Sequence, residues 1–264
     1  MKNIKNSKVK VLFLYFGGKS NQINEIIQIM AKHYDEFEVV VDVFGGSAKV
    51  LLNIPLEWRK MKVYNDVNKD LYITFKVLQD KQKREELIEK INLSFAHENI
   101  FNELKESKPN NDIDIAFKTI YLFSYSYKSS GTVFIREYKY RGLPKPHFEF
   151  VNILKDWVIE NKDFRELMDL YNKPTVLLYL DPPYLTSGKR YKYQFDFQDF
   201  LDLRYKLQQH KGTYLMNLSM HDKSMIDIFG NPNMISEYSL SVVDTEEGTR
   251  PTWQCGYWWK FKSL

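Results

Sequence analysis

The sequence has few of the residues that bind metals or form covalent cross-links. Cys255 is the only cysteine among 264 residues, which excludes an intramolecular disulfide and a cysteine cluster for zinc or iron–sulfur binding. The five histidines, His221 among them, show no metal-ligand spacing, so we expect structural or surface histidines and no bound metal. A chain of this composition fits a reducing, cytoplasmic setting.

Long hydrophobic runs are also missing. The basic segment 1–10 is followed by apolar residues that are interrupted by Gly17, Gly18 and Lys19, so we expect neither a signal peptide nor a membrane span. Hydrophobic residues make up 44% of the chain, which is ordinary for a soluble protein with its own core. The net charge of +4 only hints at an anionic partner, and the local distribution of charge must decide that question.

The most informative segment is Asp-Pro-Pro-Tyr at residues 181–184, which ends an apolar strand expected over 175–180. Proline donates no N–H and cannot continue a sheet ladder, so this strand end offers only acceptors and one aromatic ring. Such a site suits an exocyclic amino group, because its two hydrogens need two acceptors and its parent ring needs a flat surface. For Asp-Pro-Pro alone, a rigid turn after a core strand is the alternative.

Two glycine turns precede helical patterns. Residues 16–20, Phe-Gly-Gly-Lys-Ser, lead into apolar positions spaced for a helix over 23–30. Gly-Gly-Ser at 45–47 joins a buried strand within 37–44 to a helix expected over 48–52. Neither turn is a complete dinucleotide fingerprint, and no Walker lysine pattern is present, so simple turn chemistry is the alternative for each.

An acidic residue supports a ligand-binding role for the second turn, at residues 45–47. Asp66 follows a short strand at 63–64 and lies 24 residues after Asp42, close to the spacing of an acid that binds ribose hydroxyls. Close backbone approach at 45–47 and the carboxylate of Asp66 suit an adenosine, and no pyrophosphate is required. We therefore expect S-adenosylmethionine rather than NAD, with residues 17–19 supplying N–H groups and a cation to its carboxylate.

The middle of the chain differs in character. Residues from 68 to about 117 are strongly helical in pattern and predict a helical insertion. In residues 121–142, aromatic and basic side chains alternate irregularly around a Ser-Ser-Gly turn. From Lys128 to Lys145 there are five Lys or Arg residues and one acidic residue, Glu137. This pattern predicts a hairpin offered to nucleic acid, because basic residues bind phosphates and arginine can read guanine. An aromatic hairpin packed on the helices is the alternative.

Taken in order, these motifs resemble the DNA adenine-N6 methyltransferases of the Dam type, including their bacteriophage relatives. The likeness covers nearly the whole chain, from the Gly-Gly-Lys corner to Asp-Pro-Pro-Tyr. It implies an α/β fold: a Rossmann-like S-adenosylmethionine-dependent methyltransferase core over 1–67 and 147–264, with a helical and hairpin target-recognition insertion over 68–146. Double-stranded DNA is the implied substrate, and GATC is the first guess for the recognition sequence.

The resemblance also assigns roles to residues. The cofactor-binding set is Phe16, Gly17, Gly18, Lys19, Asp42, Phe44, Gly45, Gly46, Ser47, Asp66, Asp163 and Phe164. The DNA-binding set is Tyr127, Lys128, Arg136, Lys139 and Arg141. At the catalytic site, we expect the Asp181 carboxylate and the Pro182 carbonyl to accept the two N6 hydrogens of an adenine that Tyr184 stacks on after it has left the duplex.

Two alternatives stay open at this point. Relatives of Asp-Pro-Pro-Tyr also serve amino methyltransferases that act on cytosine N4 or on an RNA guanine, and a non-catalytic nucleic-acid-binding homologue could keep the fold. The sequence leaves open a restriction enzyme as partner, the oligomeric state and a chromosomal or phage origin. The resemblance places the protein in the cytoplasm of a bacterial or phage-infected cell.

Overall fold

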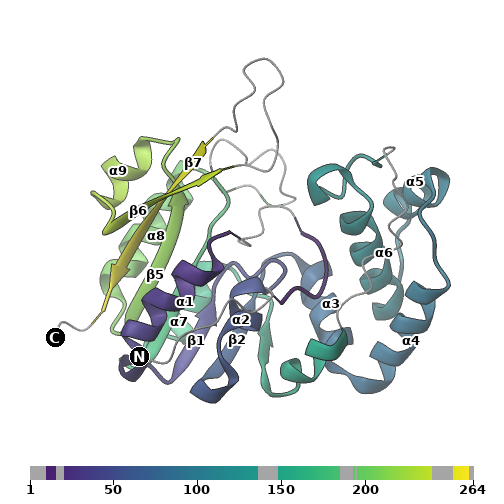
Figure 1. Ribbon diagram of the computed structural model, residues 1–264, viewed down its shortest axis with the longest axis horizontal. Coiled ribbons are helices and arrows are strands. Elements are labelled where there is room, and N and C mark those ends of the chain that lie inside the picture. The colour runs from purple at the N-terminus through teal and green to yellow at the C-terminus, as the bar shows by residue number, and fades with distance from the viewer. Residues whose placement is uncertain are drawn as a thin grey trace.

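The computed structural model describes residues 10–15, 21–135, 148–184, 193, 195–239 and 252–261. Within these residues the chain forms an α/β fold around a seven-stranded sheet in the order β3-β2-β1-β4-β5-β7-β6 (Figure 1). The strands are β1 Val39–Asp42, β2 Met61–Asn65, β3 Val158–Glu160, β4 Val176–Leu180, β5 Thr213–Ser219, β6 Met234–Ser239 and β7 Thr252–Lys260. The helices are α1 Ile23–Lys32, α2 Lys49–Asn53, α3 Lys69–Gln79, α4 Lys81–Asn92, α5 Glu98–Glu106, α6 Asp112–Ser124, α7 Phe164–Leu170, α8 Phe197–Gln209 and α9 Ser224–Phe229.

The five strands β3, β2, β1, β4 and β5 run parallel, and β7 is antiparallel to its neighbours β5 and β6. Along this order the chain builds outward from β1 in one direction as β2 and β3, and in the other as β4 and β5. The switch point of the sheet therefore lies between β1 and β4. In an open α/β sheet, ligands bind outside the carboxyl ends of the strands at such a point. The expected Rossmann-like core is confirmed.

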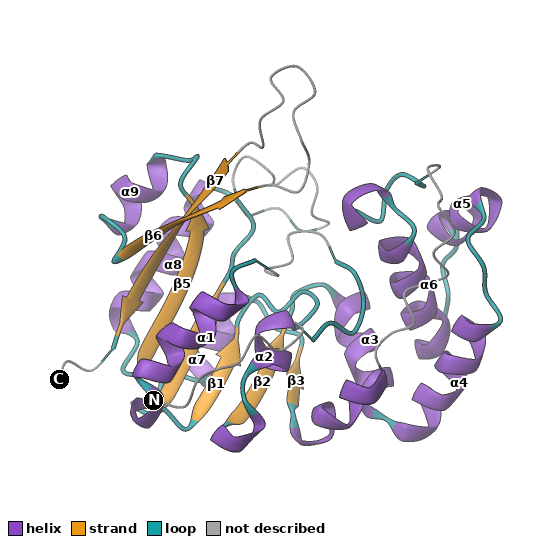
Figure 2. Ribbon diagram, viewed as in Figure 1, coloured by secondary structure: helices purple, strands orange, loops and turns teal. Residues whose placement is uncertain are grey.

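Helices cover both faces of the sheet, as the ribbon coloured by secondary structure shows (Figure 2). Alternate residues of β4 separate the two cores: Leu177 and Tyr179 pack on the side of α1 and α2, whereas Leu178 and Leu180 pack on the side of α7, α8 and α9. All five residues of β4 are buried. The continuous apolar run of this strand is therefore explained by burial on both faces, as in other parallel sheets.

The helices α3 to α6 lie beside the sheet, next to β2 and β3 (Figure 1). The side chain of Asn68 caps α3 by accepting the N–H of Asp70 at 3.1 Å. Phe75 of α3 packs against the ring of Tyr64 on β2, with ring centroids 4.1 Å apart, and so ties these helices to the sheet. The helical pattern expected from residue 68 onward is confirmed. Among the described residues, no helix is long and apolar enough to cross a bilayer.

The expected hairpin over residues 121–142 is wrong in its first part. Tyr121 belongs to α6, is fully buried, and donates its hydroxyl hydrogen to the carbonyl of Phe95 at 2.9 Å. The helical spacing of apolar residues continues to this position, because α6 buries that side against α3 and α4. A tight turn follows, closed by an antiparallel bridge between Ser126 and Phe134, and residues 136–142 lie outside the described part of the chain.

A partly buried polar cluster joins α1 to the antiparallel end of the sheet. The hydroxyl of Tyr257 on β7 donates to Oε2 of Glu25 at 2.9 Å, and the hydroxyl of Tyr238 on β6 donates to the same oxygen. The two hydroxyl oxygens lie 2.5 Å apart. Burial is the main cause that raises the pKa of both tyrosines, so they remain protonated donors at neutral pH. The cluster therefore holds α1 against β6 and β7.

Replacing Tyr257 by phenylalanine should lower the free energy of unfolding by about 1 to 3 kcal/mol, because the half-buried Glu25 carboxylate loses one of its two tyrosine donors. Urea denaturation followed by circular dichroism measures the change. Tyr205→Phe is the matched control, since Tyr205 is 61% exposed and its loss should fall within about 0.5 kcal/mol. Equal stability of the two variants would contradict this reading of the cluster.

Candidate active site

The carboxyl ends of four parallel strands bring the predicted site residues to one edge of the sheet. Asp42 ends β1, Asp66 follows β2, Asp163 follows β3 and Asp181 follows β4. Asp42 stands in register with Tyr64 on one side and with Tyr179 on the other. The glycine turn after β1 and the segment 181–184 after β4 thus flank the switch point, as expected for a ligand crevice.

The turn after β1 needs glycine at residue 45. Gly45 donates its N–H to the carbonyl of Asn65 at 2.7 Å, and a Cβ at this position would lie 2.3 Å from the ring of Tyr64. Gly46 has a φ of +51°, and its carbonyl accepts the hydroxyl hydrogen of Tyr64 at 2.9 Å. The backbone of the turn after β1 therefore contacts the backbone at the end of β2 directly, with no side chain between them. Ser47 is buried beside the turn, and α2 begins two residues later at Lys49.

Asp66 faces this turn. Its Oδ2 accepts the N–H of Gly46 at 2.9 Å, and its Oδ1 accepts the N–H of Asn68 at 2.8 Å. Burial raises the pKa of Asp66 to about 6, although the N–H bonds from Asn68 and Gly46 oppose that rise. Each carboxylate oxygen has further lone pairs, so Asp66 can accept additional hydrogen bonds from a ligand beside the turn.

The loop after β3 is fastened to the end of β2 by two asparagine side chains. Asn65 Nδ2 donates to the carbonyls of Val43 and Lys162 at 3.0 and 3.1 Å, and its Oδ1 accepts the N–H of Lys162 at 2.9 Å. Asn161 Nδ2 donates to the carbonyl of Asp66 at 2.7 Å. These bonds join β1, β2 and the loop after β3, so Asp66 and Asp163 keep a defined relation to the glycine turn.

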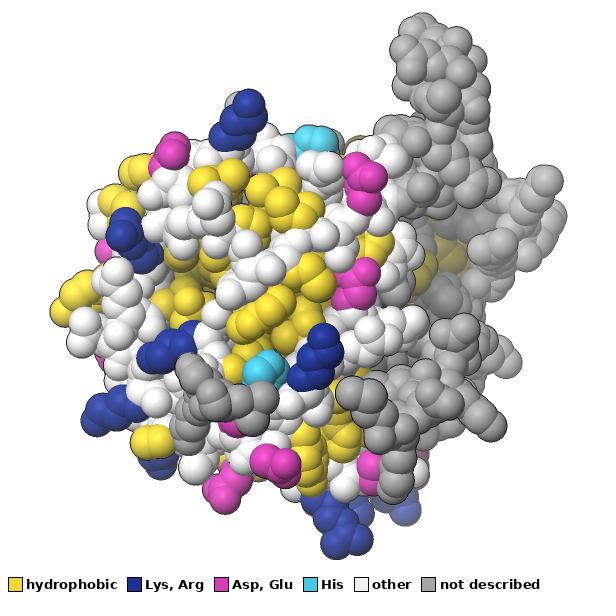
Figure 3. Space-filling model, turned by 60° about the vertical axis from the view of Figure 1, so that its left-hand side comes forward, with side chains coloured by type: hydrophobic (Ala, Val, Ile, Leu, Met, Phe, Trp, Pro, Cys, Tyr) yellow, Lys and Arg dark blue, Asp and Glu magenta, His cyan; other side chains and the backbone are white. Residues whose placement is uncertain are grey.

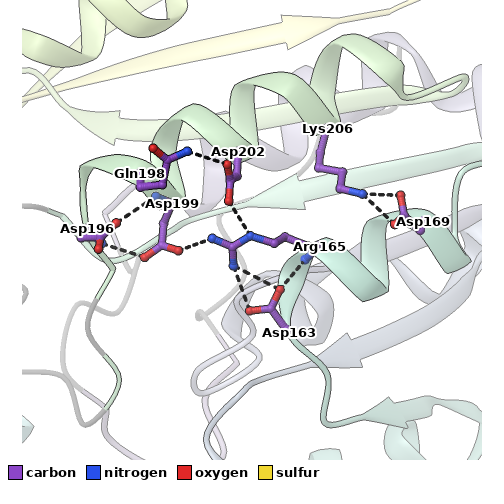
Figure 4. A network of polar contacts seen from close by, with 8 residues as sticks. All are labelled: Asp163, Arg165, Asp169, Asp196, Gln198, Asp199, Asp202 and Lys206. Atoms are coloured by element: carbon purple, nitrogen blue, oxygen red, sulfur yellow. Dashed lines mark hydrogen bonds and ion pairs between the residues drawn. The ribbon is translucent and has the colours of Figure 1, made fainter.

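Asp163 is the N-cap of α7 and accepts the N–H of Arg165 at 2.9 Å. Figure 4 shows the guanidinium of Arg165 between Asp163 and two acidic residues of α8, Asp199 and Asp202. Burial disfavours the charged guanidinium, but hydrogen bonds to Asp199, Asp202 and Asp163 outweigh that effect and raise the pKa of Arg165. The first turn of α7 is thereby held against α8.

Aromatic rings line the same end of the sheet. Phe44, which follows β1, lies 5.8 Å from Phe164 and 5.5 Å from Phe195 between ring centroids. Phe164 and Phe195 are buried, whereas Phe44 is half-buried. Two residues that are 120 positions apart in the chain, Phe44 and Phe164, are thus brought together where the strands end. They offer an apolar surface next to the carboxylate of Asp163.

The predicted catalytic segment emerges directly from β4. Asp181 and Tyr184 are half-buried and Pro182 is buried. Asn217 Nδ2 on the neighbouring β5 lies 3.4 Å from Oδ1 of Asp181, and Asn217 Oδ1 accepts the hydroxyl hydrogen of Tyr179 at 2.5 Å. Tyr184 packs at the edge of the core on the side of α7 and α8. Asp181, Pro182 and Tyr184 thus follow directly on the end of β4, and their proposed catalytic roles stay predictions.

Several predicted residues lie apart from this group or outside the described residues. Tyr127 and Lys128 belong to the turn after α6, where Tyr127 is 57% exposed and Lys128 Nζ lies 5.4 Å from the Tyr127 ring centroid. The predicted site residues outside the described part of the chain are Phe16, Gly17, Gly18, Lys19, Arg136, Lys139 and Arg141. Their assignments stay predictions.

Three residues of the site received no role from the sequence. Asn65 precedes Asp66, Asn217 stands within an apolar strand, and Tyr179 stands within another. A polar residue inside an otherwise apolar strand is the signal that points to Asn217, because a buried amide needs partners. Tyr179 carries no such signal, since tyrosine is common in strands. In the described residues, no group of three or more His, Cys, Asp or Glu side chains is arranged to hold a metal ion.

Comparison with known proteins found a family model and two curated relatives that each match most of the chain. The family model of the D12 class N6 adenine-specific DNA methyltransferases matches residues 15–241. The type II methyltransferase M.CviBI of Paramecium bursaria Chlorella virus NC1A is 23% identical over 224 residues, which cover 81% of this chain and 84% of that protein. The type II methyltransferase M.MjaIII of Methanocaldococcus jannaschii is 25% identical over 259 residues, covering 84% of this chain and 87% of that protein.

Gly45→Ala should destabilise the protein by about 1 to 3 kcal/mol, because the new methyl group meets the Tyr64 ring and the Asn65 carbonyl, which lies 2.8 Å from the Cβ position. Urea denaturation measures the loss. In a Tyr64→Leu background the ring is absent, so the same glycine substitution should cost less than in the wild-type background. An equal cost in both backgrounds would show that the contact with Tyr64 is not what requires glycine.

Proposed function

The chain belongs to the D12 class of N6 adenine-specific DNA methyltransferases, and from that premise we propose that S-adenosylmethionine is its methyl donor and that the strand ends described above bind this donor beside the target adenine. The enzyme methylates the N6 amino group of adenine in DNA. The observation that carries the proposal is the position of the glycine turn and the Asp-Pro-Pro-Tyr segment on the two sides of the switch point between β1 and β4.

The residues present fit S-adenosylmethionine. Glycine at residue 45 lets the turn pack directly against Tyr64 and Asn65, and this packing keeps the Gly46 N–H beside the carboxylate of Asp66. Asp66, which is anchored by the Gly46 N–H, can accept hydrogen bonds from the two ribose hydroxyls. Phe44 and Phe164 offer apolar contact to the adenine ring, and Asp163 can accept from its amino group. Asp42 and Ser47, both buried beside the turn, complete the proposed donor site.

When bound, S-adenosylmethionine supplies an electrophilic methyl group on a sulfonium. The residues of the chain must present the adenine N6 to it. The N6 lone pair is delocalised into the ring, and two acceptors localise it by binding the two amino hydrogens. The Asp181 carboxylate and the Pro182 carbonyl are such acceptors. The bond from N6 to the methyl group would form at the expense of the donor's sulfur–methyl bond, whose electrons would remain on sulfur. N6 then releases one proton, which the Asp181 carboxylate can accept.

Tyr184 stacks on the target base in this proposal. A paired adenine cannot reach a methyl group inside the protein, so the base must leave the duplex, which costs a few kcal/mol. Stacking on Tyr184 offsets part of that cost. Holding N6 in line with the methyl group lowers the barrier by proximity, a contribution that reaches roughly 7 to 11 kcal/mol in well-oriented reactions. Orientation can therefore supply much of the catalysis.

For DNA binding we propose the turn that carries Tyr127 and Lys128, together with Arg136, Lys139 and Arg141 farther along the chain. Tyr127 and Lys128 are exposed, as contact with a duplex requires. On the face shown in Figure 3, by contrast, acidic and basic side chains are interspersed among apolar ones, which is typical of a solvated surface rather than of a phosphate-binding strip. Recognition within GATC is part of the proposal.

The reaction can be tested with labelled S-adenosylmethionine and unmethylated genomic DNA, followed by digestion to nucleosides. We expect N6-methyladenine as the labelled product. Asp181→Ala should transfer no label yet bind S-adenosylmethionine within about twofold of the wild type in calorimetry, because Asp181 contacts the base and not the donor. Duplexes with and without GATC then test the recognition sequence.

Each other outcome has a definite meaning. Labelled N4-methylcytosine, or label on RNA in a competition with duplex DNA, would overturn the substrate and leave the donor site intact. Absence of S-adenosylmethionine binding by the wild type would overturn the assignment of the donor. Retained turnover in Asp181→Ala would remove the proposed role of that carboxylate.

The raised pKa of Asp66 predicts a pH-dependent donor affinity. Above about pH 6 the carboxylate is ionised and accepts hydrogen bonds, whereas below it the bound proton removes acceptor capacity. The dissociation constant for S-adenosylmethionine should therefore be about tenfold higher at pH 5 than at pH 7. Asp66→Asn should bind weakly at both values with a pH ratio near one. A pH ratio in Asp66→Asn equal to that of the wild type would rule out Asp66 as the titrating group.

A further inference from the structure

Asn217 is a fully buried amide at the carboxyl end of β5, next to the strand that carries the proposed catalytic carboxylate. Its Nδ2 lies 3.4 Å from Asp181 Oδ1 and 4.0 Å from Cys255 Sγ, and its Oδ1 accepts from the Tyr179 hydroxyl at 2.5 Å. A buried polar side chain costs free energy unless its partners are in place. The Asn217 amide has hydrogen-bonding partners on both of its polar atoms, Tyr179 and Asp181. It therefore links a tyrosine of the core to Asp181.

The direction of the amide is determined by its partners. An ionised carboxylate only accepts hydrogen bonds, so the NH₂ group of Asn217 must face Asp181 and its oxygen must face Tyr179. Burial, followed by the nearby charges of Asp181 and Asp42, raises the pKa of Tyr179 well above its usual value. Tyr179 therefore remains a hydroxyl donor at neutral pH. Its single hydrogen fixes which way the amide points.

We propose that Asn217 is a positioning residue for methyl transfer: oriented by Tyr179, its amide holds Oδ1 of Asp181 and so sets the orientation in which the carboxylate accepts an N6 hydrogen. This inference rests on the proposed function. Rotation of the carboxylate about its Cβ–Cγ bond would displace the acceptor on which the N6 geometry depends, and the Asn217 amide opposes that rotation. At 3.4 Å the contact is long, as catalytic hydrogen bonds often are before the substrate is bound.

The consequence should appear in the chemical step. A misplacement of about 1 Å in a reacting geometry can slow a reaction by about 100-fold. In single-turnover reactions with saturating donor and duplex, Asn217→Leu should therefore be about 100-fold slower than the wild type, and Tyr179→Phe about tenfold slower. Dissociation constants for S-adenosylmethionine and for the duplex should stay within about twofold, because Asn217 touches neither. All rates are referred to the fraction of folded protein measured by circular dichroism.

A double variant separates positioning from general loss of structure. If Tyr179 acts through Asn217, then Tyr179→Phe combined with Asn217→Leu should be no slower than Asn217→Leu alone. Tyr257→Phe is the matched control, because Tyr257 is also a buried tyrosine on this sheet and stands in register with Asn217. Its hydroxyl bonds Glu25 instead, so the variant should lose stability but keep the wild-type single-turnover rate.

Three results would overturn the inference: single-turnover rates of the folded variants within twofold of the wild type, rate losses that multiply in the double variant, or a rate loss in Tyr257→Phe as large as that in Tyr179→Phe. Should Asn217→Leu fail to fold, Tyr179→Phe still decides the question, since it removes only a hydroxyl. Failure of the proposed function is seen separately, as absence of N6-methyladenine from the wild-type reaction.

Discussion

The parallel pairing of β1 with β2 on one side and β4 on the other is the constraint on which the site depends. Because parallel strands end at the same edge of a sheet, this pairing places the turn after β1, the acid after β2 and the segment after β4 together. Asp42, Tyr64 and Tyr179 then stand side by side across three strands. The close approach of the backbones at Gly45 and Asn65 follows from the same pairing and leaves no space for a Cβ.

Buried amides and hydroxyls convert that arrangement into a defined geometry. Asn65 bridges β1, β2 and the loop after β3, whereas Asn217 bridges β4 and β5 beside Asp181. Each amide is buried, so each needs both donor and acceptor partners, and those needs restrict how the loops can sit. The donor half and the catalytic half of the site are thus held by the same kind of interaction on either side of the switch point.

The strand ends and the glycine turn could be predicted because their signals are local. An apolar run that stops at Asp181-Pro182-Pro183 marks a strand end through the chemistry of proline, and Gly45-Gly46 marks a turn through the lack of a Cβ. At the end of α6, by contrast, local sequence patterns did not predict the structure correctly. Interleaved aromatic and basic residues predicted a hairpin from Tyr121, yet this tyrosine lies within α6, because packing against α3 and α4 prevails over local strand preference.

The sequence by itself determined the order of the motifs, the residue types that carry the chemistry and the family to which they belong. Only the tertiary structure decided that Phe44 and Phe164 adjoin, that Asp66 receives the Gly46 N–H, and that Asn217 connects Tyr179 to Asp181. The physical reason is that these contacts join residues distant in the chain. They form only when strands pair in one register, and no local propensity encodes that register for an individual side chain.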